Sequence, residues 1–519
     1  MTVDLNHLLA VSLGGFVLLF ALWRRRSSLH MIPGPESPSW IYGNMLDLLL
    51  PSTYGSNEFA WQKTYGMAYR IRGCLGQNRL VISDPLALQH VIRSSNFDHA
   101  QRKKAANVAL YGAGSVPSVK GEEHRRLRAG LAVGFTASSI AEYQSALERI
   151  AKKISDQFDA RQQEDCVNVC PLMGNAALAA AAELVFGGET LDESLIADIV
   201  KIMPRWPGQS KSELLIDGIG AISPLFFKAA TLYLQSFKLL REVESHATRV
   251  ARQIFKAKAT AIEREEVDIH SGHGHDLYTR MLLSAPNNKK KLSDEEIIAQ
   301  TSVFLIAGHE TTASTLAFAL LELARHPDFQ QKLREEVVLN QGSIEYDSIP
   351  LLNAFIKESL RIYPAAALRE RVAVKDDLIP LSEPIITTTG KRITEIPVRR
   401  GEQVTLALAS YHRLEKFWGE DAESFNPYRW IDGKISPGEA IGPYANLASF
   451  FGGPHVCPGW RFAVLEMQVI LCELIRHFSF TLPPNETVRI KIANTLHPTD
   501  ANGEKCLRLC VRRVGERID

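Results

Sequence analysis

Apolar residues recur at helical spacing through much of the chain. The longest such run begins at a capping box, with Ser293 as the N-cap and Glu296 as the third helical residue, and continues to Arg325. Pro327 then ends the pattern, because proline disfavours helical backbone in the residue before it. At about 1.5 Å per residue the predicted helix is about 48 Å long, enough to cross a whole domain.

Shorter patterns predict the other elements. Helical spacing also occurs at residues 84–92, 121–128, 140–265, 350–362 and 462–470. Strand-like runs, rich in β-branched residues, occur at residues 68–72, 79–83, 378–404 and 478–514. Residues 97–119 have little periodicity and several Gly and Pro, so we expect a loop there.

The N-terminus carries an apolar run over residues 5–23, followed at once by Arg24, Arg25 and Arg26. A helix of about 19 residues can span a bilayer, and the arginines would stay on the cytosolic side. A secretory signal peptide is disfavoured, because no small-residue cleavage site follows and the basic cluster comes after the run. The sequence predicts a membrane anchor over residues 1–26, with a buried core helix as the alternative.

Composition and charge exclude little. The chain has 519 residues, 45% of them hydrophobic, and its formal net charge of +1 gives no reason to expect nucleic-acid binding. The seven cysteines are scattered without a C-x-x-C framework, which favours reduced thiols. Cys166/Cys170 and Cys506/Cys510 are each four residues apart, a spacing that only weakly supports a metal site or a disulfide. Residues 271–275, SGHGH, fit a polar loop better than a metal tract.

One glycine-rich segment has the most specific pattern. Phe450, Gly453, Cys457 and Gly459 have the spacing F-x-x-G-x-x-x-C-x-G, and a helical pattern begins just after them. A helix N-terminus favours a thiolate at Cys457, and a thiolate in a glycine-lined turn is suited to ligating iron. A lone cysteine would more simply be a small buried side chain. The whole pattern resembles the cysteine loop of the cytochrome P-450 superfamily, the haem-thiolate monooxygenases, which implies that Cys457 is the axial ligand and that the other three residues contact the haem.

The resemblance also implies which residues bind the haem propionates. The family most often has Arg two residues before the cysteine, where this chain has His455. His124 stands in place of Trp in the family pattern W-x-x-x-R, which ends here at Arg128. Both histidines can donate hydrogen bonds, but their charge depends on pH. We therefore expect Arg128 and Arg371 to supply most of the permanent charge around the propionates.

The middle of the long helix departs from its apolar pattern. Residues 307–312, AGHETT, place an acid and an alcohol beside a glycine, and they match the family's acid–alcohol pattern at every constrained position. A glycine in a helix can also be a kink that serves packing alone. The resemblance implies that Thr311 hydrogen-bonds dioxygen at the haem and that Glu310 relays protons from water.

Three charged residues are expected to support the cysteine loop. Glu358 and Arg361 lie three apart on one helix face, which alone is a common surface pair of little weight. The segment around Arg429, FNPYRW, resembles the family's P-x-R-(F/W) segment. The resemblance implies that the three residues form a buried network behind the loop, with a structural role in retaining haem.

The motifs occur in the family's order along nearly the whole chain. They imply a mainly α fold, a helical haem domain with small β-sheets over residues 41–519, joined to the transmembrane helix by a proline-rich hinge over residues 27–40. The implied cofactor is haem b. The segment 38–44 and the cysteine loop look most like those of fungal members. The resemblance implies a single-pass protein of the endoplasmic reticulum membrane with a cytosolic catalytic domain.

The implied reaction is monooxygenation, in which R–H, O2, two electrons and two protons give R–OH and water. Electrons would come from an NADPH-cytochrome reductase, because no second cofactor motif is evident. Arg125 and Arg126 fit either a docking surface for that reductase or a solvated helix face. Three alanines in residues 365–368 predict a roomy apolar pocket for a bulky terpenoid or other secondary metabolite. The alternatives are a haem-thiolate peroxide isomerase, against which Glu310 and Thr311 argue, and a non-catalytic haem-binding membrane protein.

Overall fold

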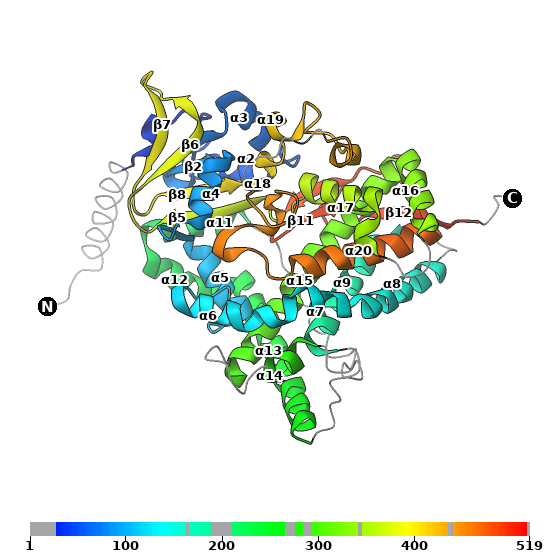
Figure 1. Cartoon of the computed structure of the whole chain (residues 1–519). Helices are drawn as coiled ribbons and strands as arrows, with labels where there is room; N and C mark the ends of the chain where they lie inside the picture. Colours follow the sequence, from blue (N-terminus) through cyan, green and yellow to red (C-terminus); the bar gives the residue numbers. More distant parts are fainter. Residues whose placement is uncertain are drawn as a thin grey trace. The chain divides into compact units, whose positions relative to one another are not determined.

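The computed structural model describes residues 27–161, 166–187, 210–264, 276–283, 292–340, 345–433, 435 and 440–515. The predicted membrane anchor over residues 1–26 and the segment 271–275 lie outside the described residues. The chain divides into two compact units, and each is described here by itself (Figure 1). The unit that we call the sheet unit consists of Met1–Lys103, Gln209–Tyr233 and Leu368–Tyr411. The unit that we call the helical unit consists of Lys104–Gly208, Leu234–Ala367 and His412–Asp519.

The sheet unit is built on a five-stranded sheet with the order β1-β2-β8-β5-β3. Its strands are β1 (Ala68–Arg72), β2 (Asn78–Ile82), β3 (Phe97–His99), β5 (Leu368–Ala373) and β8 (Gln403–Ala407). Strands β2 and β8 pair in parallel, and the other neighbours pair antiparallel. The parallel pair is apolar and fully buried at Leu80 and Leu406, as expected for the centre of a sheet.

A hairpin and short helices complete the sheet unit. The hairpin of β6 (Asp377–Ile386) and β7 (Arg392–Val398) packs against the helix α4 (Pro85–Arg93), whose N-cap Asp84 accepts a hydrogen bond from the Ala87 N–H. The other elements of this unit are η1 (Leu29–Met31), α2 (Met45–Leu49), α3 (Glu58–Tyr65), η2 (Cys74–Gly76), α11 (Lys211–Ile222), α12 (Pro224–Tyr233) and α18 (Leu408–Tyr411).

The segment that follows the predicted anchor is tied to the sheet unit. The Ser28 N–H and hydroxyl donate to the Glu402 carboxylate at 2.9 and 2.6 Å, and Leu29 is fully buried. The Arg70 N–H donates to the Pro33 carbonyl at 2.8 Å, and a Cβ at Gly34 would overlap the Arg70 carbonyl. Residues 28–34 are thus held against the sheet unit, while the predicted hinge over residues 27–40 stays a prediction.

The prediction of a loop over residues 97–119 is wrong for its first half. That half contains β3 and the helix α5 (Gln101–Tyr111). Polar contacts made outside the helix support α5: Arg102 binds Asp217, and the Asn107 amide donates to the Pro117 carbonyl at 2.7 Å. Local spacing missed the helix, because tertiary contacts can stabilise a helix that has almost no amphipathic pattern of its own.

The helical unit is organised around α15 (Asp294–Arg325), the long helix that the capping box predicts. The capping box is present, and α15 packs along α9 (Val169–Phe186) and α13 (Gln235–Glu263). Figure 1 shows α8 (Gln144–Asp159), α9 and α20 (Trp460–His477) running past one another in this unit. Among the described residues, α9 and α15 are long and apolar enough to cross a bilayer, but each is 72% buried, which is typical of core helices.

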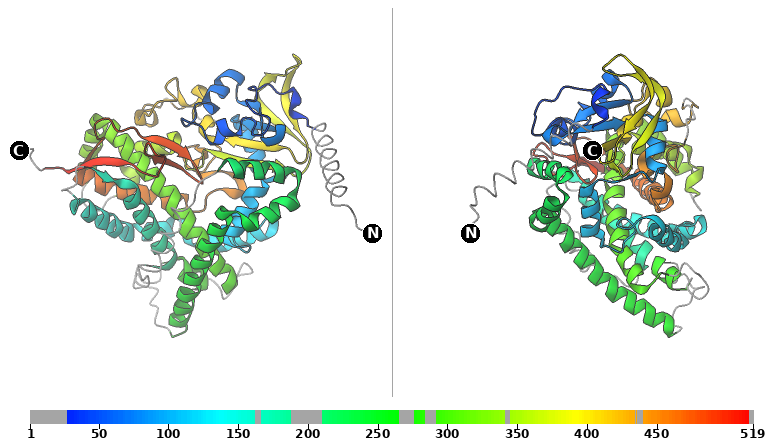
Figure 2. Two further views of the ribbon diagram at one scale, coloured as in Figure 1. Left: turned by 180° about the vertical axis from the view of Figure 1, so that it is seen from behind. Right: turned by 90° about the vertical axis from the view of Figure 1, so that its left-hand side faces the viewer.

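The other helices of this unit are short, apart from α13, whose far end extends past its neighbours (Figure 2). They are α6 (Gly121–Leu131), η3 (Ala132–Phe135), α7 (Ala137–Glu142), α14 (Leu277–Leu283), α16 (Pro327–Leu339), η5 (Tyr346–Ser348), α17 (Pro350–Ile362), α19 (Glu415–Trp418), η6 (Pro427–Trp430), η7 (Ala448–Phe450) and η8 (Gly453–His455).

Two small sheets lie in the C-terminal part of the helical unit. One has the order β4-β12-β9, with β4 (Val167–Asn168), β9 (Phe478–Thr481) and β12 (Arg508–Arg513), and the other is a hairpin of β10 (Arg489–Ile492) and β11 (Leu496–Thr499). The prediction of a mainly helical chain with small sheets is therefore confirmed. A single catalytic domain over residues 41–519 stays a prediction.

Candidate active site

The cysteine loop is a tight turn just before α20. The Cys457 N–H donates to the Phe450 carbonyl at 2.9 Å, which closes the loop. Phe451 and Gly453 have φ angles of +57° and +58°, in the left-handed region that favours glycine and is strained for other residues. Cys457 is half-buried and lies three residues before Trp460, the first residue of α20. The predicted thiolate position at a helix N-terminus is therefore present.

Phe450 and Gly459, the other two residues predicted to contact the haem, differ in how they are packed within the protein. Phe450 is buried, with 9% of its surface exposed. Gly459 has an ordinary φ of −88°, and a Cβ there would meet only the Phe135 ring, at 3.5 Å. No such contact within the chain requires glycine at this position. The expected haem contact of Gly459 stays a prediction.

A buried histidine connects the loop to α17. The Ala448 N–H donates to His412 Nε2 at 2.9 Å, so the proton of that ring sits on Nδ1, which lies 3.0 Å from the Arg361 carbonyl and donates to it. Burial, and then the charges of Arg361 and Arg413, hold the pKa of His412 well below its usual value, so the ring is neutral. These contacts show that His412 positions the loop backbone.

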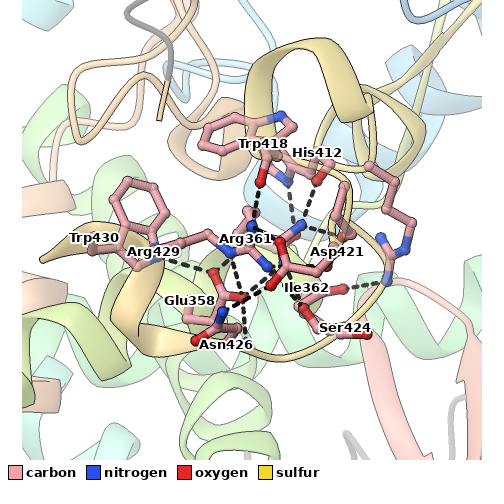
Figure 3. A network of polar contacts seen from close by, with 12 residues as sticks. Glu358, Arg361, Ile362, His412, Trp418, Asp421, Ser424, Asn426, Arg429 and Trp430 are labelled. Atoms are coloured by element: carbon pink, nitrogen blue, oxygen red, sulfur yellow. Dashed lines mark hydrogen bonds and ion pairs between the residues drawn. The ribbon is translucent and has the colours of Figure 1, made fainter. Parts of the chain in front are cut away.

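The predicted charged residues form one buried network, which we call the loop-anchor cluster (Figure 3). Glu358 and Arg361 are fully buried, and Arg429 is 2% exposed. Arg361 binds the Glu358 carboxylate through Nε at 2.9 Å and a terminal nitrogen at 2.7 Å, and Arg429 Nε binds it at 3.0 Å. The Asn426 N–H and the Trp430 indole add two further donors, at 2.8 and 2.9 Å. Glu358 thus accepts five hydrogen bonds.

The two arginines of this cluster are fully engaged as well. Arg361 also donates to the backbone carbonyls of His412, Ala422 and Ser424. Arg429 donates to the backbone carbonyls of Trp418, Asp421 and Ser424, and pairs with the Asp421 carboxylate at 2.8 Å. Since His412 bonds both Arg361 and the loop residue Ala448, the cluster connects directly to the cysteine loop.

Three of the predicted propionate ligands come together in the helical unit. The rings of His124, on α6, and His455, in the loop, have centroids 4.6 Å apart. Burial, and then the nearby charge of Arg128, lowers the pKa of His124. Burial likewise lowers the pKa of Arg128, while the negative charge of a Cys457 thiolate opposes that fall. Arg128 therefore lies close enough to Cys457 to feel its charge.

Arg371, the fourth predicted ligand, belongs to the sheet unit. It lies on β5, is 5% exposed, and donates to His99 Nδ1 and the Glu370 carbonyl, both at 3.0 Å. Burial, and then Arg369, lowers its pKa to about 10, so it remains charged at neutral pH. Its expected role at the propionates stays a prediction.

The acid–alcohol pair lies in the middle of α15. The Thr311 hydroxyl donates to the Ala307 carbonyl at 2.8 Å, one turn back along the helix. Gly308 faces α9, where a Cβ would come within 3.1 Å of the Ala181 Cβ, so this glycine serves close packing of the two helices. The Asn494 amide donates to the Glu310 carboxylate at 2.9 Å.

Asn494 stands at the tip of the β10–β11 hairpin and connects two segments. Two residues further on, the Leu496 N–H donates to the Ala365 carbonyl at 2.9 Å. The hairpin therefore brings Glu310 of α15 near Ala365, in the predicted pocket wall. Neither of these hydrogen-bond partners is evident from the sequence.

Two buried groups beside this pair were missed by sequence reasoning. His309 is 8% exposed, has no hydrogen-bond partner at Nδ1, and its pKa is lowered to about 4 by burial and then by Lys505. Glu466 of α20 is fully enclosed, and burial raises its pKa far above the usual value although Thr312 hydrogen-bonds it. Both are neutral at physiological pH. His309 occupies the unconstrained position of the acid–alcohol pattern, so no motif singles it out.

A second charged group, which we call the cavity cluster, lies in the sheet unit and was also missed. Arg102 binds Asp217 at 3.1 Å and Glu213 at 3.1 Å, and Arg79 binds Glu370 at 2.5 Å. All of these side chains except Glu213 line a cavity of about 30 Å³, enough for roughly two waters. Burial raises the pKa of Asp217 to about 7, opposed by Arg102.

The donor set of the helical unit fits haem. Among the described residues no group of three or more His, Cys, Asp or Glu could hold a metal ion by itself. A single thiolate is what a haem needs, because its porphyrin supplies the in-plane ligands. On α15, Val303, Ala307 and Thr311 recur every fourth residue and are half-buried or exposed, although most of the helix is buried. This small, partly apolar face is compatible with a flat cofactor or its substrate.

Comparison with known proteins agrees with this assignment. The cytochrome P-450 family model matches residues 33–502. Cytochrome P-450 monooxygenase 81 of Postia placenta is 29% identical over 515 residues, covering 93% of each chain. Cytochrome P-450 monooxygenase 91 of the same organism is 30% identical over 521 residues, covering 94% of each. Cytochrome P-450 monooxygenase claW of Ampulloclitocybe clavipes is 28% identical over 510 residues, covering 92% of this chain and 93% of the relative. The chain therefore belongs to the cytochrome P-450 family, with its haem-thiolate cofactor, and is a monooxygenase.

Proposed function

We propose that this monooxygenase hydroxylates a bulky apolar small molecule, a terpenoid or another secondary metabolite. The observation that supports the proposal is the small size of the side chains near Glu310. Ala307 is exposed on α15, and Ala365 and Ala366 are half-buried beside the hairpin that reaches Glu310. Alanines on adjacent segments leave room for a wide, apolar substrate.

The haem, when bound, supplies the site at which O2 is bound and activated. In our proposal the Cys457 thiolate would hold its iron, and Phe450, Gly453 and Gly459 would contact it. Arg128, Arg371, His124 and His455 bind its propionates. The loop-anchor cluster acts indirectly, because it holds the loop backbone through His412. The glycine turn and the closing hydrogen bond from Cys457 to Phe450 orient the thiolate.

Glu310 and Thr311 move protons to the reacting oxygen. The Asn494 amide holds the Glu310 carboxylate in place while leaving its other oxygen available to accept a proton from water. The Thr311 hydroxyl now donates to the Ala307 carbonyl, so its lone pairs can accept a hydrogen bond at once. To donate a proton toward the reacting oxygen, it must turn away from Ala307.

We further propose that residues 1–26 anchor the protein in the endoplasmic reticulum membrane, with the catalytic part cytosolic, and that an NADPH-cytochrome reductase supplies electrons. The contacts of Ser28 and Pro33 with the sheet unit support a defined exit for the anchor. The basic surface of α6 is partly neutralised, because Arg126 pairs with Glu296 and Arg125 pairs with Glu122. Protease protection in microsomes tests the orientation: cleavage of the catalytic part in intact vesicles is expected.

The substrate class is tested by titrating candidate molecules into the ferric enzyme and following displacement of water by the Soret shift. Bulky terpenoids are expected to give the shift at low concentration, and straight-chain fatty acids are not. The variant Ala366→Phe narrows the proposed wall and is expected to weaken terpenoid binding at least tenfold. If fatty acids bind tighter than every terpenoid, or if Ala366→Phe binds terpenoids as wild type does, the proposal is wrong.

The proton path is tested by Thr311→Ala. With substrate and reductase, this variant is expected to consume NADPH while forming mostly hydrogen peroxide, because the hydroxyl that passes protons to oxygen is gone. Thr315→Ala is the matched control, since Thr315 makes the same bond one turn further along, to the Thr311 carbonyl at 3.0 Å. Product per NADPH is the readout. Normal coupling in Thr311→Ala would exclude this role.

The propionate assignment is tested by haem retention. Arg128→Ala and Arg371→Ala are expected to lose more haem than His455→Ala, because only the arginines carry charge throughout the working pH range. Haem per folded chain, measured by absorbance after gel filtration, is the readout. Equal or reversed losses would show that His455 does the work of the arginine found at this position in most family members.

A further inference from the structure

Two cysteine pairs face each other across the small β4–β12 ladder. In that antiparallel pairing Asn168 lies opposite Arg508, and Val167 lies opposite Leu509. The same register, continued by one residue, sets Cys166 opposite Cys510. Continued the other way, it sets Cys170 opposite Cys506. The pKa of Cys170 is raised by burial and also by the nearby charge of Cys506, as expected for two neighbouring thiols. The two cysteines of each four-residue spacing therefore lie opposite the two cysteines of the other.

The backbone hydrogen bonds show whether opposite residues form a hydrogen-bonded or a non-hydrogen-bonded pair. The Val169 N–H donates to the Leu507 carbonyl at 2.9 Å, so Val169 and Leu507 form a hydrogen-bonded pair. Hydrogen-bonded and non-hydrogen-bonded pairs alternate along an antiparallel ladder, and Cα atoms of the latter are about 4.5 Å apart. Cys166 and Cys510 fall at a non-hydrogen-bonded position. That spacing lies within the range of about 4.4–6.8 Å which a disulfide bridges.

The register and the side-chain directions are both fixed. The Asn168 side-chain oxygen accepts hydrogen bonds from the Cys170 N–H at 3.2 Å and the Leu507 N–H at 3.1 Å, which prevents the strands from slipping. Val167 and Leu509 are buried and point inward. Successive side chains alternate in a strand, so Cys510, next to Leu509, is on the opposite face. Cys166 directly precedes β4, and continuing the alternation by one residue puts it on the same face; both cysteines are half-buried.

We propose that Cys166 and Cys510 form a reversible disulfide when the enzyme meets a peroxide. The two thiols and one hydrogen peroxide give one disulfide and two waters, so two electrons pass from sulfur to peroxide oxygen. Neither cysteine is in a disulfide in the part of the chain that the structure describes, which therefore represents the reduced form. A monooxygenase that fails to couple electron transfer to product releases this oxidant itself.

The Cys170–Cys506 pair is a built-in control. It continues the same register, but Cys170 lies in the first turn of α9 and is buried. Burial raises the pKa of Cys170 to about 12, so its thiolate, the reactive form, is rare. The Cys166–Cys510 pair should therefore oxidise and the Cys170–Cys506 pair should stay reduced.

The bond would fasten strand β12 to the residues that lead into α9. In Figure 2 β12 is the red strand that runs to the C-terminus. Helix α9 in turn packs along α15, which carries Glu310 and Thr311. A cross-link between chain segments so distant in sequence limits the unfolded state more than the folded one. Oxidation is thus expected to raise the unfolding temperature by a few degrees without altering the fold.

The test uses the full-length holoenzyme. After mild treatment with hydrogen peroxide, free thiols are alkylated and the non-reduced digest is examined by mass spectrometry. We expect a linked peptide that joins Cys166 to Cys510, with Cys170 and Cys506 alkylated. The rise in unfolding temperature should appear in wild type, Cys170→Ser and Cys506→Ser, disappear in Cys166→Ser and Cys510→Ser, and be reversed by dithiothreitol.

Several outcomes would overturn the proposal. One is alkylation of both Cys166 and Cys510 at a peroxide dose that raises the unfolding temperature. Another is a Cys170–Cys506 link in place of the expected one. A third is the same temperature rise in Cys166→Ser as in wild type. The reduced carbonyl-bound spectrum, followed in parallel, reports whether Cys457 itself has been oxidised, so damage at the haem is distinguished from the proposed bond.

Discussion

The two units bury ionised side chains in contrasting ways. In the loop-anchor cluster every charged group has several partners, and the charges of Glu358, Asp421, Arg361 and Arg429 sum to zero. In the cavity cluster two arginines face three carboxylates, so the sum is −1 when all are ionised. Beside the same cavity, Arg79 Nε and the Gln403 side-chain oxygen have no hydrogen-bond partner in the part of the chain that the structure describes.

This difference shows what a buried ionic group requires in order to be rigid. Glu358 is held by five donors from two arginines, a backbone N–H and an indole, and the remaining arginine hydrogens go to backbone carbonyls and to the Asp421 carboxylate. Such a network has one arrangement. The cavity cluster has surplus negative charge, and burial together with Glu370 raises the pKa of Asp217 to about 7. It is therefore able to change protonation near physiological pH.

The largest effect is expected from Glu358→Gln. This change leaves Arg361 and Arg429 buried with too little negative charge and puts an amide NH2 among donors, so we expect a loss of about 3–5 kcal/mol in the free energy of unfolding. Urea unfolding of the full chain is the measurement, with haem content as a second readout. Haem should be lost in parallel, because the cluster positions the cysteine loop through His412.

The matched control is Glu122→Gln. Glu122 pairs with Arg125 three residues further along a helix, as Glu358 pairs with Arg361. The side chains of Glu122 and Arg125, however, are 84% and 73% exposed. Exposed pairs contribute about 0–1 kcal/mol. A loss in Glu358→Gln no larger than in Glu122→Gln would show that burial and partner number do not set the strength of these networks.

The two clusters also differ in how far sequence could predict them. Glu358 and Arg361 lie three apart on one helix, and Arg429 sits in a recognisable segment, so the resemblance identified all three. Arg102 and Asp217 are far apart in the chain, and neither lies in a motif. Helix α5, which carries Arg102, was itself expected to be a loop, because it has almost no apolar periodicity. Pattern reasoning cannot find a group whose partners are set only by tertiary packing.

The candidate site shows the same limit on what sequence patterns can predict. Cys457, Glu310 and Thr311 lie in long, specific patterns, and the capping box fixed the start of α15. Asn494 and His412 hold these groups in place through single hydrogen bonds to distant segments. Glu466 looks like one polar residue on an amphipathic helix, and its complete burial depends on how α20 meets its neighbours. For Asn494, His412 and Glu466 the positioning contact depends on tertiary packing, so no local pattern reveals it.

The next effect in size is expected from Asp217→Asn, and it depends on pH. The pKa of Asp217 is about 7 in the folded chain and about 4 when unfolded, so between those values the folded state binds more protons. The free energy of unfolding of wild type should therefore fall as pH rises from about 4 to about 7, by at most about 4 kcal/mol at 1.36 kcal/mol per unit. Asn mimics the neutral acid, so the variant should lose this slope and be more stable than wild type at pH 8.

Asp421→Asn is the corresponding change in the loop-anchor cluster. There, burial is outweighed by hydrogen bonds from Asn426 and Arg429, so the pKa of Asp421 is lowered and its stabilising effect is lost only below the unfolded pKa of about 4. Between pH 5.5 and 8 this variant should show a constant, small loss. Denaturant titrations at several pH values measure both slopes. Parallel curves for wild type and Asp217→Asn would mean that Asp217 is ionised throughout.

The smallest effect is expected from Gln403→Leu, and its counterpart is Trp430→Phe. The Gln403 oxygen has no partner among the described residues, and replacing an unpaired polar group by an apolar one of similar shape is nearly neutral, so the free energy of unfolding should change by less than about 0.5 kcal/mol. Trp430→Phe keeps a ring but removes a hydrogen bond to the buried Glu358 carboxylate, at a cost of about 1.5–3 kcal/mol. Denaturation at one pH measures both. A loss above about 1 kcal/mol in Gln403→Leu would show that water in the cavity bonds Gln403 and Arg79. The cavity cluster would then be as fully satisfied as the loop-anchor cluster, and its excess charge alone would account for the titration of Asp217.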